Sequence, residues 1–364
     1  MANAALNEIK KIVFFYALRA ANAIARVASL RREAVMEMHA VRTWAGSLGL
    51  AFALLATPAF AGFSVHDGRL IDACGDVFVM RGVNLPHAWK PRATGKAIRE
   101  TAKLGSNTVR VVLSDGTRWR RTSPHAVRRI IARARHAGQV VILEVHDTTG
   151  YGLEPKAAHI GAALAYWTKL EPVLRGQEDY VLVNIGNEPT AGTATPQQWL
   201  EAHRTAIVAL RALGLRHTLV IDAHDYGQDS SGTMRDRAAE LFAIDPLRNL
   251  VFDVHMYEVY GEAQAVESYL RAFEAARLPL IVGEFGPDHR GQAVDEEAIF
   301  RLSGAMGLGY LGWSWSGNAP EVADLDLVER FDGRRLTPWG RRFFDGAGGV
   351  RETSRRSRVF SGCR

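Results

Sequence analysis

The sequence predicts an α/β fold, a single (β/α)8 barrel of the TIM type, over residues 62–364. Short apolar runs rich in β-branched residues alternate eight times with amphipathic stretches of helical length. These repeats occupy about 250 residues, which is the usual length of such a barrel. No linker rich in Pro, Gly or Ser divides them, so a second domain is not expected.

The predicted strands combine β-branched and aromatic residues with little interruption, as expected for parallel strands that are buried on both faces. In chain order they are Phe78–Val83, Asn107–Leu113, Gln139–His146, Tyr180–Asn187, Thr218–Asp222, Leu250–His255, Leu280–Phe285 and Tyr310–Trp315. The stretches between them have helical periodicity, for example Ala126–Ala137, Pro196–Leu213 and Ala263–Ala276. Gly138 and Gly214 follow two of these stretches, where a helix C-terminal cap is expected.

Residues 38–61 have the features of a secretory signal peptide. Arg42 precedes an apolar segment, Leu48–Ala56, and Ala59-Phe60-Ala61 supplies the small residues of a cleavage site. Cleavage is expected before Gly62, and the protein is expected to be secreted, either extracellular or periplasmic in transit.

Residues 1–37 do not belong to a normal signal peptide and are interpreted as an upstream extension. Met36 or Met38 is a possible true start, which would make the extension mis-assigned. The alternative is an amphipathic membrane anchor built on Ile12–Leu30. No later segment has the roughly 18 consecutive apolar residues of a spanning helix, so no stable membrane association of the mature chain is expected.

The charge balance argues against a nucleic-acid partner. Residues 62–364 carry 38 Lys and Arg side chains against 36 Asp and Glu side chains. Nucleic-acid binding would need a clustered excess of basic charge. The arginine-rich tail at residues 351–364 is interpreted as a solvated terminus.

The chain has two cysteines, Cys74 near the mature start and Cys363 near the end. Export permits a disulfide, and the termini of compact domains often lie close together. Two unpaired thiols remain the alternative. If the cysteines pair, the bond is expected to fasten the tail against the bottom of the barrel.

Two predicted strands end in a glutamate. The apolar run from Tyr180 ends at Asn187 and Glu188, and Pro189 prevents its continuation; Glu284 ends the run that starts at Leu280. A carboxylate at the end of a buried strand is costly unless it has a partner or a function. Because the active sites of these barrels lie at the carboxyl ends of the strands, the two glutamates are expected to converge on one site.

Other polar and aromatic residues stand at the same ends of the predicted strands. They are Asn84, His87, Asp115, His146, Asp147, Asp222, His224, His255, Tyr257 and Trp315. Taken singly, each could be a hydrogen-bonded structural residue, as most buried polar groups are. Together, at matching positions, they indicate a catalytic face.

The kind of chemistry follows partly by exclusion. The sequence has no HxH or HExxH metal motif, no GxSxG elbow and no glycine-rich phosphate loop, so neither a metal nor a cofactor is expected. Two carboxylates with aromatic neighbours suit glycoside cleavage, in which one carboxyl group is protonated and the other is ionised. Trp313 and Trp315 offer flat faces against which a sugar ring can stack.

Several motifs around these residues occur in a fixed order: VRVVLSDG (109–116), LEVHDTTGYG (143–152), DVHMYE (253–258), GEFG (283–286) and WSWSGN (313–318). Together with Asn187-Glu188 they resemble glycoside hydrolase family 5, and most of all its bacterial endo-β-1,4-mannanase subgroup. The resemblance extends over nearly the whole mature chain. It implies a monomeric, endo-acting enzyme that cleaves β-mannan polysaccharides with retention of configuration.

The resemblance, together with the chemistry, implies that Glu188 is the general acid and base and that Glu284 is the nucleophile. The expected substrate-site residues are Arg110 and Tyr257 beside Glu284, Asn187 at the sugar 2-hydroxyl, His146 and His255 as positioning groups, Trp315 as the stacking floor, and His87, Trp89, Trp119 and Tyr151 at outer subsites. An endo-β-1,4-glucanase of the same family is the alternative, because mannose and glucose differ only at C2. A non-catalytic sugar-binding barrel is disfavoured because it would need neither glutamate.

Overall fold

The computed structural model describes residues 62–363, which form a closed barrel of eight parallel strands. Around the barrel the strands run in the order β3-β4-β5-β6-β7-β8-β9-β12, and β12 pairs with β3 to close the ring. The (β/α)8 prediction is therefore confirmed. The predicted signal peptide and the upstream extension lie outside the described residues.

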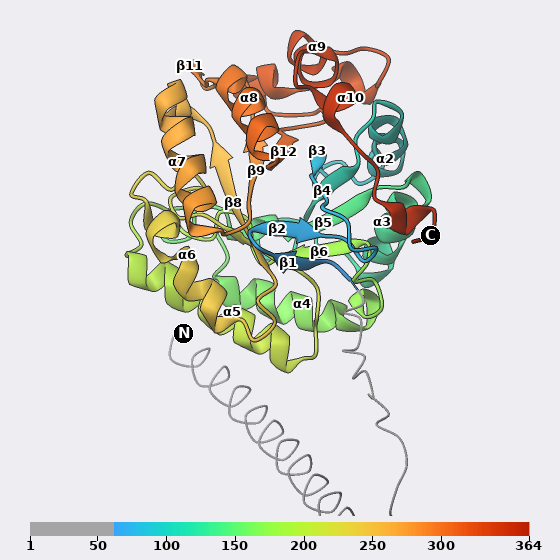
Figure 1. Cartoon of the computed structure of the whole chain (residues 1–364). Coiled ribbons are helices and arrows are strands. Elements are labelled where there is room, and N and C mark those ends of the chain that lie inside the picture. Colours follow the sequence, from blue (N-terminus) through green and yellow to red (C-terminus); the bar gives the residue numbers. More distant parts are fainter. Residues whose placement is uncertain (1–61, 364) are drawn as a thin grey trace, which may run out of the picture. The chain divides into compact units, whose positions relative to one another are not determined.

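The barrel strands are followed by helices that cover the outside of the barrel (Figure 1). The strands are β3 (Arg81–Leu85), β4 (Thr108–Leu113), β5 (Val140–Val145), β6 (Val181–Asn184), β7 (Leu219–Asp222), β8 (Leu250–Met256), β9 (Leu280–Phe285) and β12 (Gly309–Gly312). The helices are α2 (Thr94–Lys103), α3 (Pro124–Ala137), α4 (Ile160–Leu174), α5 (Pro196–Ala212), α6 (Thr233–Ile244), α7 (Ala263–Ala276), α8 (Glu296–Met306), α9 (Pro338–Asp345) and α10 (Val350–Thr353).

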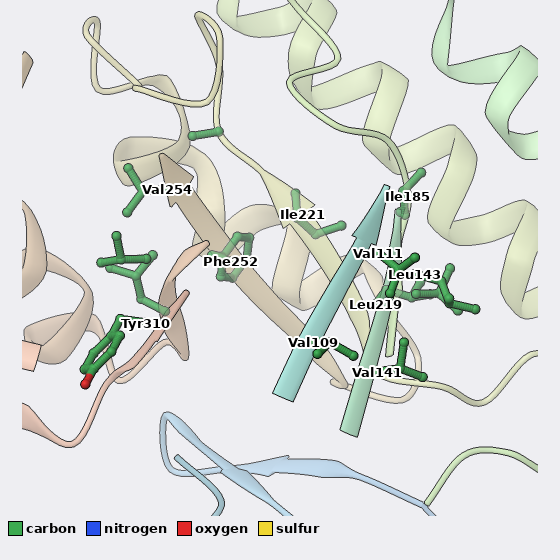
Figure 2. Close-up of a cluster of buried hydrophobic side chains, with 14 of the residues drawn as sticks. Val109, Val111, Val141, Leu143, Ile185, Leu219, Ile221, Phe252, Val254 and Tyr310 are labelled. Atoms are coloured by element: carbon green, nitrogen blue, oxygen red, sulfur yellow. The ribbon is translucent and has the colours of Figure 1, made fainter. Parts of the chain in front are cut away.

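Side chains alternate along each strand between the outside and the inside of the barrel. Val109 and Val111 of β4 and Val141 and Leu143 of β5 belong to the large hydrophobic cluster under the helices (Figure 2). The residues between them point into the barrel, because successive side chains of a strand face opposite sides.

Two layers of side chains fill the barrel interior. The lower layer is apolar and includes Ile142, Leu182, Val220, Val251, Ile281 and Leu311. Two residues further along four of these strands stand Glu144, Asn184, Asp222 and Asp253, all with no exposed surface. Because a strand repeats every two residues, both sets face inward. The interior therefore changes from apolar to polar toward the carboxyl ends of the strands.

A hairpin of β1 (Ser64–His66) and β2 (Arg69–Ile71) precedes the barrel. Leu70 packs into the same cluster as the lower layer, so the hairpin closes the bottom of the barrel. Cys74, just after this hairpin, forms a disulfide with Cys363. The predicted fastening of the tail is thus confirmed, and the sequence alternative of two free thiols is wrong.

Three predicted strands differ from the observed strands by more than one residue at an end. The first strand begins at Arg81 rather than Phe78, because the amide of Phe78 donates to Leu70 of the hairpin instead of joining the barrel. The fourth strand ends at Asn184 and the last at Gly312, so Asn187, Glu188, Trp313 and Trp315 stand on the loops that follow. Among residues 62–363 no helix combines the length and the apolar composition needed to cross a membrane.

Candidate active site

Arg110 lies at the centre of the polar layer. Its side chain stands on β4, has no exposed surface and donates hydrogen bonds to five side chains. Nη1 reaches Asn84 and Glu284, and Nη2 reaches Asn184, Asn187 and Asp222. One guanidinium thus ties together residues of β3, β4, β6, β7 and β9 and the loop after β6.

Glu284 is the penultimate residue of β9, and both of its carboxylate oxygens are hydrogen-bonded. Nη1 of Arg110 donates to Oε1 at 2.8 Å, and the hydroxyl of Tyr257 donates to Oε2 at 2.9 Å. Burial raises the pKa of Glu284 to about 7, while Arg110, His146 and the Tyr257 hydroxyl oppose that rise by stabilising the charged form. These partners favour an ionised Glu284.

Glu188 lies on the loop after β6, at the same end of the barrel. Its backbone has a φ of 41°, a left-handed conformation that is uncommon for residues other than glycine. The amide of Glu188 donates to Oδ2 of Asp222 at 3.0 Å, and its Oε1 lies 2.8 Å from Nδ1 of His255. Burial, followed by the charges of Glu284 and Asp222, raises the pKa of Glu188 well above its usual value.

The protonation of the pair follows from these environments. Burial, with Arg110 and His146 nearby, lowers the pKa of His255 well below its usual value, so this imidazole is neutral. A neutral Nδ1 can accept the hydrogen bond of a protonated Glu188. Among the described residues, Glu188 has no cationic partner comparable to the Arg110 of Glu284. When one proton is shared by the two carboxyl groups, it therefore belongs on Glu188.

The two glutamates approach each other across the barrel mouth. A carboxylate oxygen of Glu188 and one of Glu284 lie within 4.8 Å of each other, and both lie within that distance of a ring nitrogen of His255. Nδ1 of His255 is 3.6 Å from Oε2 of Glu284. The expectation that the strand-end glutamates converge on one site is thus met in the geometry.

The side chain of Asn187, the residue before Glu188, is held by two hydrogen bonds. Its Oδ1 accepts from Nη2 of Arg110 at 2.6 Å, and its Nδ2 donates to Thr149 at 2.7 Å. The amide plane is therefore fixed, with Oδ1 turned toward Arg110.

An aromatic cluster lies beside the glutamates. The ring of His146 is stacked on that of Trp313, with centroids 5.6 Å apart and an angle of 18° between planes. Trp89 meets His146 edge-on at 5.0 Å, and Trp119 lies 5.8 Å from it. Nδ1 of His146 lies 3.0 Å from Oε1 of Glu144, which fixes the orientation of the ring.

The prediction that Trp315 forms the stacking floor is wrong. Its side chain has no exposed surface and packs edge-on against Phe344 of α9. Beyond Gly312 the chain leaves the ladder, and the amides of Ser314 and Trp315 donate to Leu325 and Asn84. This path turns Trp315 into the core. Trp313, which joins the aromatic cluster, is the tryptophan of this pair that lies at the site.

Two other predicted residues have side-chain contacts with residues other than the glutamates. His87 is buried, and its Nδ1 bonds the hydroxyl of Thr94 at the start of α2. Tyr151 is exposed and lies edge-on against His159. Their roles at outer subsites stay predictions. Trp89 and Trp119, by contrast, join the aromatic cluster.

Sequence reasoning counted Asp222 among the residues of the catalytic face without a specific role, and it did not single out the other two acidic side chains of the polar layer, Glu144 and Asp253. The signal was present, because each follows an apolar inward residue by two positions on a predicted strand. Within the described residues, two groups of three side chains bring possible metal ligands within 4.8 Å: Glu188, His255 and Glu284, and Asp222, Asp253 and His255. The first group is the glutamate pair itself, and the expectation of no metal stays a prediction.

Comparison with known proteins gives consistent matches. The profile of the family described as Cellulase (glycosyl hydrolase family 5) matches residues 71–319. The mannan endo-1,4-β-mannosidase of Cellvibrio japonicus is 46% identical over 318 residues, which cover 87% of this chain and 74% of that protein. The enzyme of the same name from Streptomyces lividans is 47% identical over 322 residues, covering 86% and 83%. A solved mannotriose complex of a Thermomonospora fusca β-mannanase has a TM-score of 0.80 and 46% identity, covering 82% of this chain and 99% of that one.

Proposed function

Because the chain belongs to glycoside hydrolase family 5, we propose that it is an endo-β-1,4-mannanase that cleaves internal bonds of mannan, galactomannan or glucomannan with retention of configuration. The relatives named as mannan endo-1,4-β-mannosidases and the mannotriose complex support the substrate class. The single observation that supports the mechanism is the closeness of the two glutamates.

The separation of the carboxyl groups distinguishes the two stereochemical outcomes. Retaining glycosidases hold their carboxyl groups about 5–5.5 Å apart, whereas inverting enzymes need about 6.5–9.5 Å to admit a water. Oxygens of Glu188 and Glu284 within 4.8 Å of each other favour retention.

In the first step, Glu284 attacks the anomeric carbon while Glu188 gives its proton to the glycosidic oxygen. The bond between that carbon and the oxygen breaks, and the leaving chain departs as an alcohol. The sugar is left as an ester of Glu284, and Glu188 is left as a carboxylate. In the second step Glu188 takes a proton from water, the water oxygen bonds to the anomeric carbon, and Glu284 is released.

The surrounding residues fit these roles. The hydrogen bonds from Arg110 and Tyr257 hold Glu284 ionised and aimed. We assign Asn187, whose side chain is held by Arg110 and Thr149, to the sugar 2-hydroxyl. We assign to Trp313, whose ring is stacked on that of His146, the sugar-stacking role that the sequence assigned to Trp315.

We also propose that the enzyme is secreted and acts as a monomer. The signal-peptide features before Gly62 and the disulfide between Cys74 and Cys363 both support export. N-terminal sequencing of exported protein should find Gly62 or a residue within a few positions of it. Retention of residues 1–37 would contradict this assignment.

An endo-β-1,4-glucanase is the second candidate, favoured by the family profile described as Cellulase. The test is reducing-sugar release from linear mannan, glucomannan and carboxymethyl-cellulose under one set of conditions, with Glu284→Ala prepared in parallel as a control for contaminating activity. We expect the highest rate on mannan or glucomannan and a weak rate on cellulose. Activity on cellulose equal to or above that on mannan would favour the glucanase.

Product analysis tests the endo mode and the stereochemistry in the same samples. Early products should be a mixture of oligosaccharides, and NMR of fresh product should show the β anomer. Mannose as the sole early product, or the α anomer, would contradict the proposal.

A further inference from the structure

Asp222 ends β7 inside the polar layer and has no exposed surface. Its carboxylate accepts three hydrogen bonds. Oδ2 receives the backbone amide of Glu188 at 3.0 Å and Nη2 of Arg110 at 3.3 Å, and Oδ1 receives the side-chain amide of Asn184. Asp222 therefore contacts the backbone of the residue assigned as the acid and the guanidinium that holds the assigned nucleophile.

From these contacts we propose that Asp222 is a positioning residue for the acid–base glutamate, which it holds in place through the backbone amide of Glu188. This inference rests on the proposed glycosidase function and adds a role that the two glutamates and their direct partners do not explain.

The backbone of Glu188 gives a reason for such a residue. A φ of 41° is costly for a residue with a Cβ, and it persists only where surrounding contacts hold it. The amide of Glu188 has one hydrogen-bond partner among the described residues, Oδ2 of Asp222. Arg110 has four other partners besides Asp222, so losing Asp222 should disturb Glu188 more than Glu284.

An asparagine at this position cannot replace the aspartate. Both carboxylate oxygens accept, whereas a carboxamide offers one oxygen and one NH2 group. With its oxygen toward Glu188 and Arg110, the NH2 group would face the donating NH2 of Asn184. In the opposite orientation it would face the amide of Glu188 and Nη2 of Arg110. Either orientation sets donors against each other, although Asp222→Asn preserves the volume of the side chain.

A comparison of two substrates with different leaving groups distinguishes a positioning role of Asp222 from a purely structural one. A mannooligosaccharide needs a proton on its leaving oxygen, whereas an aryl β-mannoside with a dinitrophenolate leaving group does not. For Asp222→Asn we expect kcat/KM on mannohexaose to fall by about 10- to 100-fold, which is at or below the lower end of the roughly 10²–10⁴-fold that general acid catalysis contributes. On the aryl substrate we expect a loss of about threefold or less.

The pH profile provides a second readout. Several titratable or charged groups surround Glu188: Arg110 of β4, Glu144 of β5, Asp222 of β7, His255 of β8, Glu284 of β9, and Tyr226 and Tyr257 of the loops after β7 and β8. Asp222→Asn removes one negative charge from this set. Because a negative neighbour keeps the proton on Glu188, the alkaline limb of kcat/KM should move to lower pH.

Asp245→Asn is the matched control. Asp245 is equally buried and accepts two hydrogen bonds from Arg211 and two from backbone amides, away from the glutamates. Asp245→Asn should lower thermal stability as Asp222→Asn does. It should leave unchanged both the ratio of kcat/KM on mannohexaose to kcat/KM on the aryl β-mannoside and the alkaline limb of the pH profile. Glu188→Ala gives the largest change expected in this ratio, because the general acid is then absent.

Equal losses on both substrates with an unmoved alkaline limb would overturn the proposal. If Asp222→Asn does not fold, Asp222→Ser, which leaves room for a bridging water, is measured in the same way. Failure of both to fold would identify Asp222 as a folding residue and also overturn the proposal. The oligosaccharide is chosen from whichever β-glycan the unmodified enzyme cleaves, so an error in the mannan assignment stays distinguishable from an error about Asp222.

Discussion

Within residues 62–363, the hydroxyl of Tyr257 is one of two side-chain donors to the Glu284 carboxylate, and removing it leaves the ring in place. In Tyr257→Phe the ionised form of Glu284 loses a hydrogen bond, so the pKa of this carboxyl group should rise further above about 7. The acid limb of kcat/KM should therefore move to higher pH, by about one unit for a bond worth about 1.4 kcal/mol. A pH series of initial rates measures the shift.

Tyr260→Phe is the control for this variant. Tyr260 is also buried, but its hydroxyl donates to the carbonyl of Gln228 and does not contact either glutamate. The acid limb of kcat/KM for Tyr260→Phe should match that of the unmodified enzyme. An unmoved limb in Tyr257→Phe would show that Tyr257 does not set the ionisation of Glu284.

The two glutamates should differ in what their removal abolishes. Glu284→Ala should be inactive on every substrate, because no glycosyl ester can form. Glu188→Ala should keep the first step on substrates with a good leaving group, and added azide should release a β-glycosyl azide. Both variants should lose about 3 kcal/mol or more of transition-state stabilisation on mannan. Near-normal rates for Glu284→Ala would refute the assignment.

At the residue scale, sequence reasoning identified the two glutamates and their partners, but it chose the wrong one of two neighbouring tryptophans. Glu188, Glu284, Arg110 and Tyr257 lie together as the barrel rule requires. Trp313 and Trp315 have the same spacing that puts two residues on one face of a strand, yet their segment is not a strand. No local pattern in the sequence indicates where that ladder ends, because the ends are set by contacts with Leu325 and Asn84.

At the scale of elements, helix α5 begins with a reciprocal cap. The Thr195 hydroxyl accepts from the amide of Gln198, and the Gln198 side chain accepts from the amide of Thr195. Thr195→Ala removes one of these bonds and should lower the free energy of unfolding by about 1 kcal/mol, with activity unchanged. Chemical denaturation provides the measurement.

Thr168→Ala is the control for Thr195→Ala: it also replaces a threonine by alanine, but no loss of stability is expected. Thr168 is exposed in the middle of α4, where its hydroxyl bonds the carbonyl of Leu164 within the helix. Alanine has the higher helix propensity, so the free energy of unfolding should stay unchanged or rise by a few tenths of a kcal/mol. Equal losses for both variants would mean that the cap of α5 contributes nothing.

Element types were predictable from the sequence because their signals are local. The eight apolar runs and the glycines at helix ends follow from side-chain burial and backbone freedom. Gly138, with a φ of 71°, is the C-terminal cap of α3, as predicted. The later start of the first strand was not predictable, because it depends on a tertiary contact. The amide of Phe78 donates to Leu70 of the hairpin and does not pair with a strand of the barrel.

At the scale of the whole molecule, the disulfide closes a loop of nearly the full described chain, since Cys74 and Cys363 are 289 residues apart. Loss of the disulfide increases the conformational entropy of the unfolded state more than that of the folded state. The double variant Cys74→Ser, Cys363→Ser should lose about 2–5 kcal/mol of unfolding free energy. Activity at 25 °C should be unchanged, because the bond lies at the end of the barrel opposite the glutamates.

The same experiment contains its own control. A reductant should lower the melting temperature of the unmodified protein toward that of the double variant, and should not affect the double variant. A melting temperature that is the same for both proteins would show that fastening the tail does not stabilise the fold.

The layered interior of the barrel has a consequence for how this enzyme can be altered. The lower layer, with Ile142, Leu182 and Val220, is a separate hydrophobic cluster that touches the hairpin and not the glutamates. The layer above it concentrates carboxyl groups around Arg110, an arrangement that a fold retains at a cost in stability. The residues that stabilise the fold and the residues assigned to the reaction thus lie toward opposite ends of the same strands. An engineer can repack the lower end to tolerate heat while leaving the reaction at the upper end as selection made it.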